Sequence, residues 1–242
     1  MIFDLLQDLN QECSFTDSIK ASTYIEKINK NNNSSNQKGY RNSILCILSK
    51  CDQLYDHIPE NEKDLYMKQK ISKICSEIDE KSGTHFHNFK FNEKLMKSSK
   101  IQLGLQLSEK NQTMISSIYY LTELFRKHFI FVTNNKLFRT CIKDYPKVFI
   151  VLNANQFYYL EDEKSIWKYS NPEDLFNELP IINDIKKSYK LVYKMPLEPI
   201  TKYKIDELKK IAIEYKILLK DGTKNKVKQV LYDEINLFKL KL

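Results

Sequence analysis

Residues 200–242 read ITKYKIDELKKIAIEYKILLKDGTKNKVKQVLYDEINLFKLKL. Apolar residues recur there at intervals of three and four in two separate runs, which is the period of one helix face. The first run comprises Ile205, Leu208, Ile211 and Ala212, and the second comprises Val227, Val230, Leu231 and Ile235. Asp221-Gly222, between the two runs, is a turn signal. The stretch therefore predicts two short helices joined by a basic loop.

The joining segment concentrates the positive charge of the chain. Residues 200–242 hold 11 Lys against six Asp plus Glu, so they carry +5 of the net charge of +8. A phosphate-binding face places its charge in this way, although a solvated helical pair gives the same pattern. The candidate nucleic-acid-binding residues are Lys216, Lys220, Gly222, Thr223, Lys224, Lys226 and Lys228.

This pattern resembles the SAP motif, a helix, extended linker and helix module that binds DNA. The residues that match the family are Glu207-Leu208, Ile217, Gly222-Thr223-Lys224, Val227 and Leu231. The chain departs from the family at Tyr215-Lys216, where a residue followed by Gly is usual, and at Val230, where Arg is common. The resemblance implies that the module contacts the DNA backbone. The chain also resembles proteins of large cytoplasmic DNA viruses in its Lys- and Ile-rich style.

Composition sets limits on the class of protein. With 42% hydrophobic residues and 12% aromatics, the chain is not wholly disordered. Only four glycines occur, and neither GxGxxG nor GxxxxGK[ST] is present. The absence of a long apolar run and of a signal-peptide pattern predicts a protein without a membrane span that stays inside the cell. Five widely spaced cysteines indicate a reducing compartment such as cytoplasm, nucleus or viral factory.

The rest of the chain predicts an α+β fold in three parts. Residues 1–128 read as a mostly helical region, with helices expected at 43–57, 62–81, 92–107 and 112–128 and two more before residue 30. Gly83 is expected to stop the second of these four, and His85-Phe86-His87 reads as a loop or short strand after it. Residues 129–199 read as a small α+β unit in which two Asn-rich hairpins form an antiparallel meander, followed by a helix at 173–179 and a strand at 189–193. Pro196 and Pro199 mark a linker to the C-terminal module at 200–242.

Several residue sets in the chain are candidates for chemistry. A thiol nucleophile needs a nearby base, so Cys46 or Cys13 with His128 is a conceivable dyad. Cys46 and Cys51 lie on an apolar helix face, however, so core packing is the ordinary reading of both, and no metal ligands are assigned. The acidic run at 161–163 reads as a solvated turn. The aromatic residues of the two hairpins suit the core of a sheet, although stacking on single-stranded nucleic acid is an alternative.

The sequence thus leads to one principal hypothesis and two alternatives. The principal hypothesis is a protein without enzymatic activity or cofactor that binds the DNA backbone through its C-terminal module. The first alternative is a structural or scaffolding protein, associated with a virion, whose C-terminal module docks on another protein. The second is a cysteine hydrolase.

Overall fold

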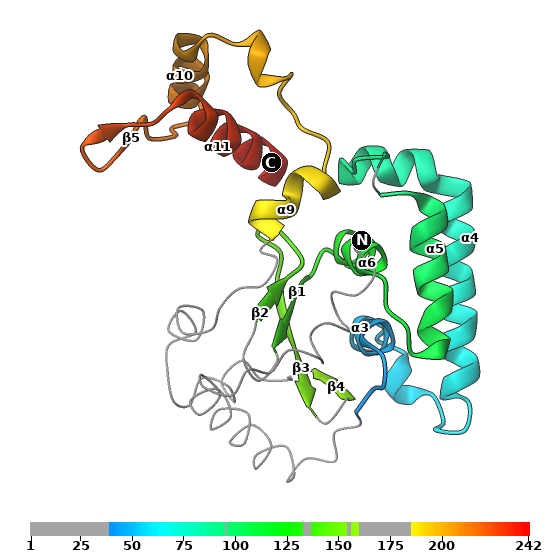
Figure 1. Ribbon diagram of the computed structural model, residues 1–242. Coiled ribbons are helices and arrows are strands. Elements are labelled where there is room, and N and C mark those ends of the chain that lie inside the picture. Colours follow the sequence, from blue (N-terminus) through cyan, green and yellow to red (C-terminus); the bar gives the residue numbers. More distant parts are fainter. Residues whose placement is uncertain (1–38, 95, 133–136, 154–155, 160–184) are drawn as a thin grey trace, which may run out of the picture.

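The structure is a computed structural model, and it describes residues 39–94, 96–132, 137–153, 156–159 and 185–242 (Figure 1). The expected helices before residue 30 and at 173–179, the acidic run at 161–163 and Cys13 lie outside the described residues. Within them the fold is α+β, as the sequence predicts. No helix of the described part is both long and apolar enough to cross a bilayer.

The helical region contains the four helices expected there, with shifted ends. They are α3 (Ser43–Cys51), α4 (Lys63–Phe89), α5 (Ser98–Leu107) and α6 (Ile115–Phe125), with short 3-10 turns at Tyr55–His57 and Ser108–Lys110. Asn42 caps α3, since its side-chain oxygen accepts a 2.8 Å hydrogen bond from the N–H of Ile44. Helix α3 contacts α6, α6 contacts α5, and α5 contacts α4. Helices α3 and α6 accordingly lie between the sheet and the α4–α5 pair (Figure 1).

Helix α4 is longer than the sequence predicts, and two expectations about its end are wrong. The helix passes through Gly83 and includes His85-Phe86-His87, which read as a loop or strand. A glycine inside a helix costs about 1 kcal/mol, and burial of apolar side chains on both sides of it, Ile78 and Phe86, outweighs that cost. The helix ends instead at Phe89, and the C-cap residue Lys90 has a left-handed φ of 59°.

The sheet contains both predicted hairpins, but it is not an antiparallel meander. Strands β1 (His128–Val132) and β2 (Leu137–Arg139) pair antiparallel, as do β3 (Lys147–Asn153) and β4 (Gln156–Tyr159). The strand order is β2-β1-β3-β4, and β1 pairs with β3 in parallel. The segment between β2 and β3 carries the chain back, so that His128 N–H donates to the carbonyl of Pro146 at 2.8 Å. The two central strands are thus deeply buried, which explains their unbroken apolar runs.

A helix replaces the strand expected at residues 189–193. Helix α9 covers Ile185–Val192. Tyr189, Val192 and Tyr193 are all buried, and their spacing of three and four is that of a helix face rather than of a strand. The aromatic and β-branched composition suggested a strand, and packing on the core decided otherwise.

The C-terminal segment contains the two predicted helices, α10 (Ile205–Glu214) and α11 (Lys228–Lys241), after a 3-10 turn at Ile200–Lys202. The joining segment is a β-hairpin, β5 (Lys220–Asp221) and β6 (Lys224–Asn225), rather than an irregular loop. The two helices share a small core made by Leu197, Leu208, Ala212, Leu231, Tyr232 and Ile235. Val227 and Val230, which the sequence assigns to this apolar face, are 62% and 41% exposed.

Residues on each side of the predicted boundary at residue 200 pack in the core of the other side. Leu197, from the proline-flanked linker, is buried in the core of the two C-terminal helices. Leu240, from the end of α11, is fully buried in the main core. The division into three domains stays a prediction, but α11 belongs to two cores at once.

Candidate nucleic-acid interface

The joining segment begins with a well-formed helix C-cap. Lys216 has a φ of 57°, and its N–H donates to the carbonyl of Ile213 at 3.0 Å. The N–H of Ile217 donates to the carbonyl of Ala212 at 2.8 Å, which completes a Schellman motif. Lys216 therefore takes the left-handed position that glycine usually fills. The departure from the SAP pattern at this residue changes the side chain and keeps the backbone geometry of a glycine cap.

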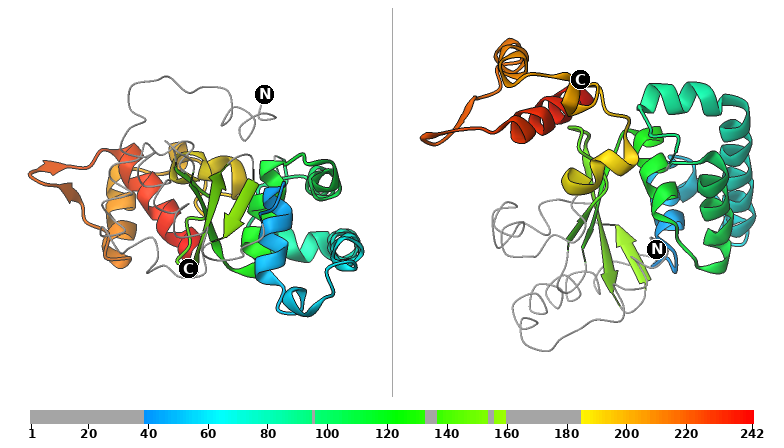
Figure 2. Two further views of the ribbon diagram at one scale, coloured as in Figure 1. Left: turned by 90° about the horizontal axis from the view of Figure 1, so that it is seen from below. Right: turned by 45° about the horizontal axis from the view of Figure 1, so that its top comes forward.

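The hairpin that follows is short and fully exposed. Lys220 is opposite Asn225 and Asp221 is opposite Lys224, and the N–H of Lys226 donates to the carbonyl of Leu219 at 2.9 Å. Gly222 opens a two-residue loop with a φ of 59°, and a Cβ built there would meet nothing within 4 Å. Glycine is favoured at the first position of such a loop because it adopts positive φ without strain. The hairpin projects away from the sheet and from helices α3 to α6 (Figure 2).

The structure separates the seven predicted site residues into two groups. Lys216, Lys220, Gly222, Thr223 and Lys224 are exposed, and Lys228 is half-buried in the first turn of α11. Lys226 differs, because its side chain is only 12% exposed and forms a 2.7 Å ion pair with Glu234. That pair links the base of the hairpin to α11. Within the described residues, the ammonium groups of the other four lysines have no carboxylate within ion-pair distance.

The two C-terminal helices differ at their N-terminal ends. The first turn of α10 holds Asp206 and Glu207, and Glu207 accepts a 2.6 Å hydrogen bond from the N–H of Lys204. The first turn of α11 contains no acidic residue, and no side chain caps it. Lys226 lies just before this turn, and Lys228 is its first residue. The positive end of the α11 dipole therefore adds to the lysine charge rather than cancelling it.

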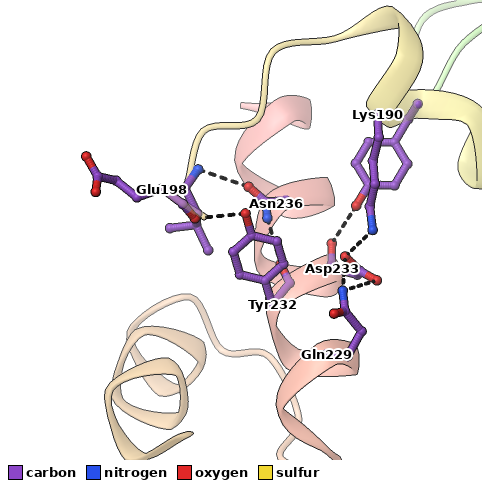
Figure 3. Close-up of polar contacts among 8 residues, drawn as sticks. Lys190, Glu198, Gln229, Tyr232, Asp233 and Asn236 are labelled. Atoms are coloured by element: carbon purple, nitrogen blue, oxygen red, sulfur yellow. Dashed lines mark hydrogen bonds and ion pairs between the residues drawn. The ribbon is translucent and has the colours of Figure 1, made fainter. Parts of the chain in front are cut away.

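Helix α9 holds α11 against the rest of the protein through Asp233. The ammonium of Lys190 lies 2.6 Å from the Asp233 carboxylate, which also accepts hydrogen bonds of 3.0 Å from Gln229 (Figure 3). The Tyr189 hydroxyl donates to the Asp233 carbonyl at 3.5 Å. Burial, and then the nearby Asp233 carboxylate, raise the pKa of Tyr189, so its hydroxyl stays a donor throughout the neutral range. These contacts fix the axis of α11, and with it the direction of the hairpin.

The linker is fixed to the other side of α11. The N–H of Leu197 donates to Asn236 Oδ1 at 2.9 Å, and the Tyr232 hydroxyl donates to the carbonyl of Glu198 at 2.8 Å (Figure 3). Asn236 is fully buried and donates in turn to the Tyr232 carbonyl. The polar atoms of this segment are thus paired when it packs on the helix, which stabilises that packing. Sequence reasoning missed this role, because Pro196 and Pro199 suggested a free linker.

A second polar cluster, buried in the body of the protein, was also missed. Glu123 of α6 is 1% exposed and accepts hydrogen bonds from Lys143 at 2.6 Å, Tyr145 at 3.0 Å and Tyr193 at 2.6 Å. Burial and the Glu123 charge raise the pKa of Tyr193 far above its ordinary value. The donors are separated from Glu123 by 20, 22 and 70 residues, so no motif spacing identifies the cluster. It joins α6, the segment before β3 and the end of α9.

The described cysteines have unreactive surroundings. Burial raises the pKa of Cys51 to about 11 and that of Cys141 to about 12, and it also raises those of Cys46 and Cys75. A thiol with a raised pKa is protonated at neutral pH and is a poor nucleophile. Among the described residues, no three His, Cys, Asp or Glu side chains form a group that could hold a metal ion.

The aromatic residues of the sheet serve mainly as core. Phe129, Phe131 and Phe149 are buried, and Phe157 packs edge-on against Phe131 with ring centroids 6.3 Å apart. Tyr159 lies partly buried against the same core, with the Lys50 ammonium 4.6 Å from its ring centroid. Stacking on single-stranded nucleic acid would require exposed ring faces on this sheet. In this sheet the rings of Phe129, Phe131, Phe149 and Phe157 pack against other core residues instead.

No family model, curated protein or solved structure matches the chain.

Proposed function

We propose that the protein binds duplex DNA through the β5–β6 hairpin and the start of α11. The observation that carries the proposal is the exposed hairpin, whose lysines form no ion pair with a carboxylate of the described residues and lie next to the positive end of a helix that no side chain caps. Phosphates are the ligands that such a surface favours. The SAP-like residue pattern supports the same conclusion.

The binding mechanism is electrostatic. Lys216, Lys220, Lys224 and Lys228 neutralise phosphates and release condensed counterions, whereas Lys226 keeps its pairing with Glu234. With four phosphates neutralised, log affinity falls against log salt with a slope of about −3.6. The rigid attachment of α11 to α9 and to the linker presents these charges in one fixed arrangement. Binding of this kind depends on salt far more than on sequence.

The test is a fluorescence anisotropy titration of a labelled 20-base-pair duplex at several salt concentrations. Changing Lys220→Gln together with Lys224→Gln removes two phosphate contacts, so the slope falls by about 1.8 and affinity at 0.1 M salt falls roughly 60-fold. Lys68→Gln with Lys73→Gln makes the same charge change on the exposed face of α4 and is the matched control. Equal losses for both variants, or no binding by the native protein at low salt, refute the proposal.

The scaffolding alternative rests on a different observation. Leu218 is 76% exposed and Val227 is 62% exposed, and both flank the base of the hairpin. Exposed apolar side chains of this size suit a protein contact. In that case Leu218→Ser with Val227→Ser abolishes association with a partner at salt concentrations that release nucleic acid, while the lysine variants have little effect. A larger loss of binding in the lysine variant than in the Leu218→Ser, Val227→Ser variant favours DNA binding instead.

A further inference from the structure

The β5–β6 hairpin has two faces of different chemistry. Residues directly opposite each other in an antiparallel pair point to the same side, and neighbours along a strand point to opposite sides. Lys220 and Asn225 therefore share one face, and Asp221 and Lys224 share the other. On the second face the carboxylate and the ammonium stand opposite each other. The first face carries one cation and one amide with no acidic residue between them.

The base of the hairpin shows which face points away from the protein. Leu219 packs against the core of the two C-terminal helices, and it shares its face with Asp221. Leu218 and Val227, which lie just outside the two strands at the base of the hairpin, are 76% and 62% exposed. The face with Lys220 and Asn225 is thus the outer one, and both of these residues are exposed.

The dimensions of the hairpin suit one groove of duplex DNA. Two paired strands are about 5 Å apart between backbones, and a ribbon of two strands fits the major groove, which is about 12 Å wide. From Leu219 to the turn the ribbon extends three residues, or about 10 Å, compared with a groove depth of about 8.5 Å. The minor groove, about 6 Å wide, is too narrow for it. At the tip, Gly222 adds no side chain that would limit the depth of entry.

We propose that the hairpin enters the major groove and reads the edge of an adenine with Asn225. This inference rests on the proposed function and adds sequence readout to backbone binding. An Asn amide pairs with N6 and N7 of adenine. Lys216, Lys220, Lys224 and Lys228 remain for the phosphates beside the groove. Asn225 thus selects sequence, and the lysines supply most of the affinity.

The experiment uses the full chain and two steps. A random 20-base-pair pool is first enriched on the native protein and sequenced, and a preference for adenine is expected at one position. The preferred duplex is then compared with the same duplex carrying 7-deazaadenine at that position, which lacks the N7 acceptor but keeps base pairing and phosphate charge. The native protein is expected to bind the substituted duplex roughly 5- to 150-fold more weakly, with an unchanged salt slope.

Two variants test whether the hairpin residue Asn225 makes the contact with the base. Asn225→Ala is expected to bind natural and substituted duplexes equally, while Gln69→Ala, an amide removed from the exposed face of α4, behaves as the native protein. Circular dichroism confirms that both variants are folded. Salt-dependent binding with no sequence preference and no effect of 7-deazaadenine overturns this inference and leaves the proposed function intact. Failure to bind any duplex, or preference for single strands, overturns both.

Discussion

Leu240→Ala tests whether α11 is anchored in the body of the protein. The Leu240 side chain is fully buried in the main core, where Leu237 also packs. Removing three carbons from such a site costs the lost transfer free energy plus the cavity left behind, which for buried leucines amounts to about 2–5 kcal/mol. Leu242→Ala is the control, because Leu242 is on the same segment and is 78% exposed. Its expected effect on the free energy of unfolding is within about 0.5 kcal/mol.

Hydrogen exchange detected by mass spectrometry locates the effect, and urea unfolding followed by circular dichroism measures its size. In Leu240→Ala the amides of α11 and α10 are expected to lose protection more than those of α4 and α5, because the anchor between the two cores is gone. Affinity for the labelled duplex is expected to fall as well, since the hairpin no longer has a fixed direction. Equal behaviour of Leu240→Ala and Leu242→Ala refutes the anchoring.

Three further predictions concern single residues. Lys216→Gly is expected to raise stability by about 0.5–1 kcal/mol in urea unfolding, because glycine adopts the left-handed C-cap conformation without strain; a loss of stability contradicts the cap geometry. Tyr193→Phe is expected to destabilise by about 1.5–3 kcal/mol, since it removes the 2.6 Å hydrogen bond to the buried Glu123 carboxylate, and an unchanged urea midpoint counts against that bond. Burial acts to raise the pKa of Asp52, but hydrogen bonds from Lys70, Tyr66 and the backbone hold it below its usual value. The stabilising contribution of Asp52 is therefore present above the ordinary aspartate pKa of about 3.9 and is lost as pH falls through the lower folded-state pKa. Asp52→Asn is expected to flatten this part of the stability curve in acid titrations.

Local patterns predicted most of the elements correctly. The apolar spacing located α3 to α6, α10 and α11, and the Asn-rich turns located both hairpins of the sheet, because these features depend on neighbours close in sequence. The errors occurred where local preference and packing disagree. At residues 189–192 a stretch that favours a strand by composition lies in helix α9, and at Gly83 helix α4 continues through a residue that favours stopping it.

The candidate site was partly predictable for the same reason. The lysine cluster and the turn near Gly222 are visible in one short stretch of sequence. The pairing of Lys226 with Glu234 is not, because it depends on how α11 lies against the base of the hairpin. The left-handed conformation of Lys216 is not either, because lysine carries no local preference for it. The Glu123 cluster could not be predicted at all, since its donors come from three separate segments.

The basic C-terminal stretch, its two helices and the α+β character of the chain follow from the sequence, because charge and hydrophobic period are properties of neighbouring residues. The parallel pairing of β1 with β3, the packing of the proline-flanked linker on α11 and the burial of Leu240 in the main core follow from tertiary packing. Each of these is a contact between distant segments, whose free energy depends on burial and hydrogen-bond pairing that exist only once the chain has folded.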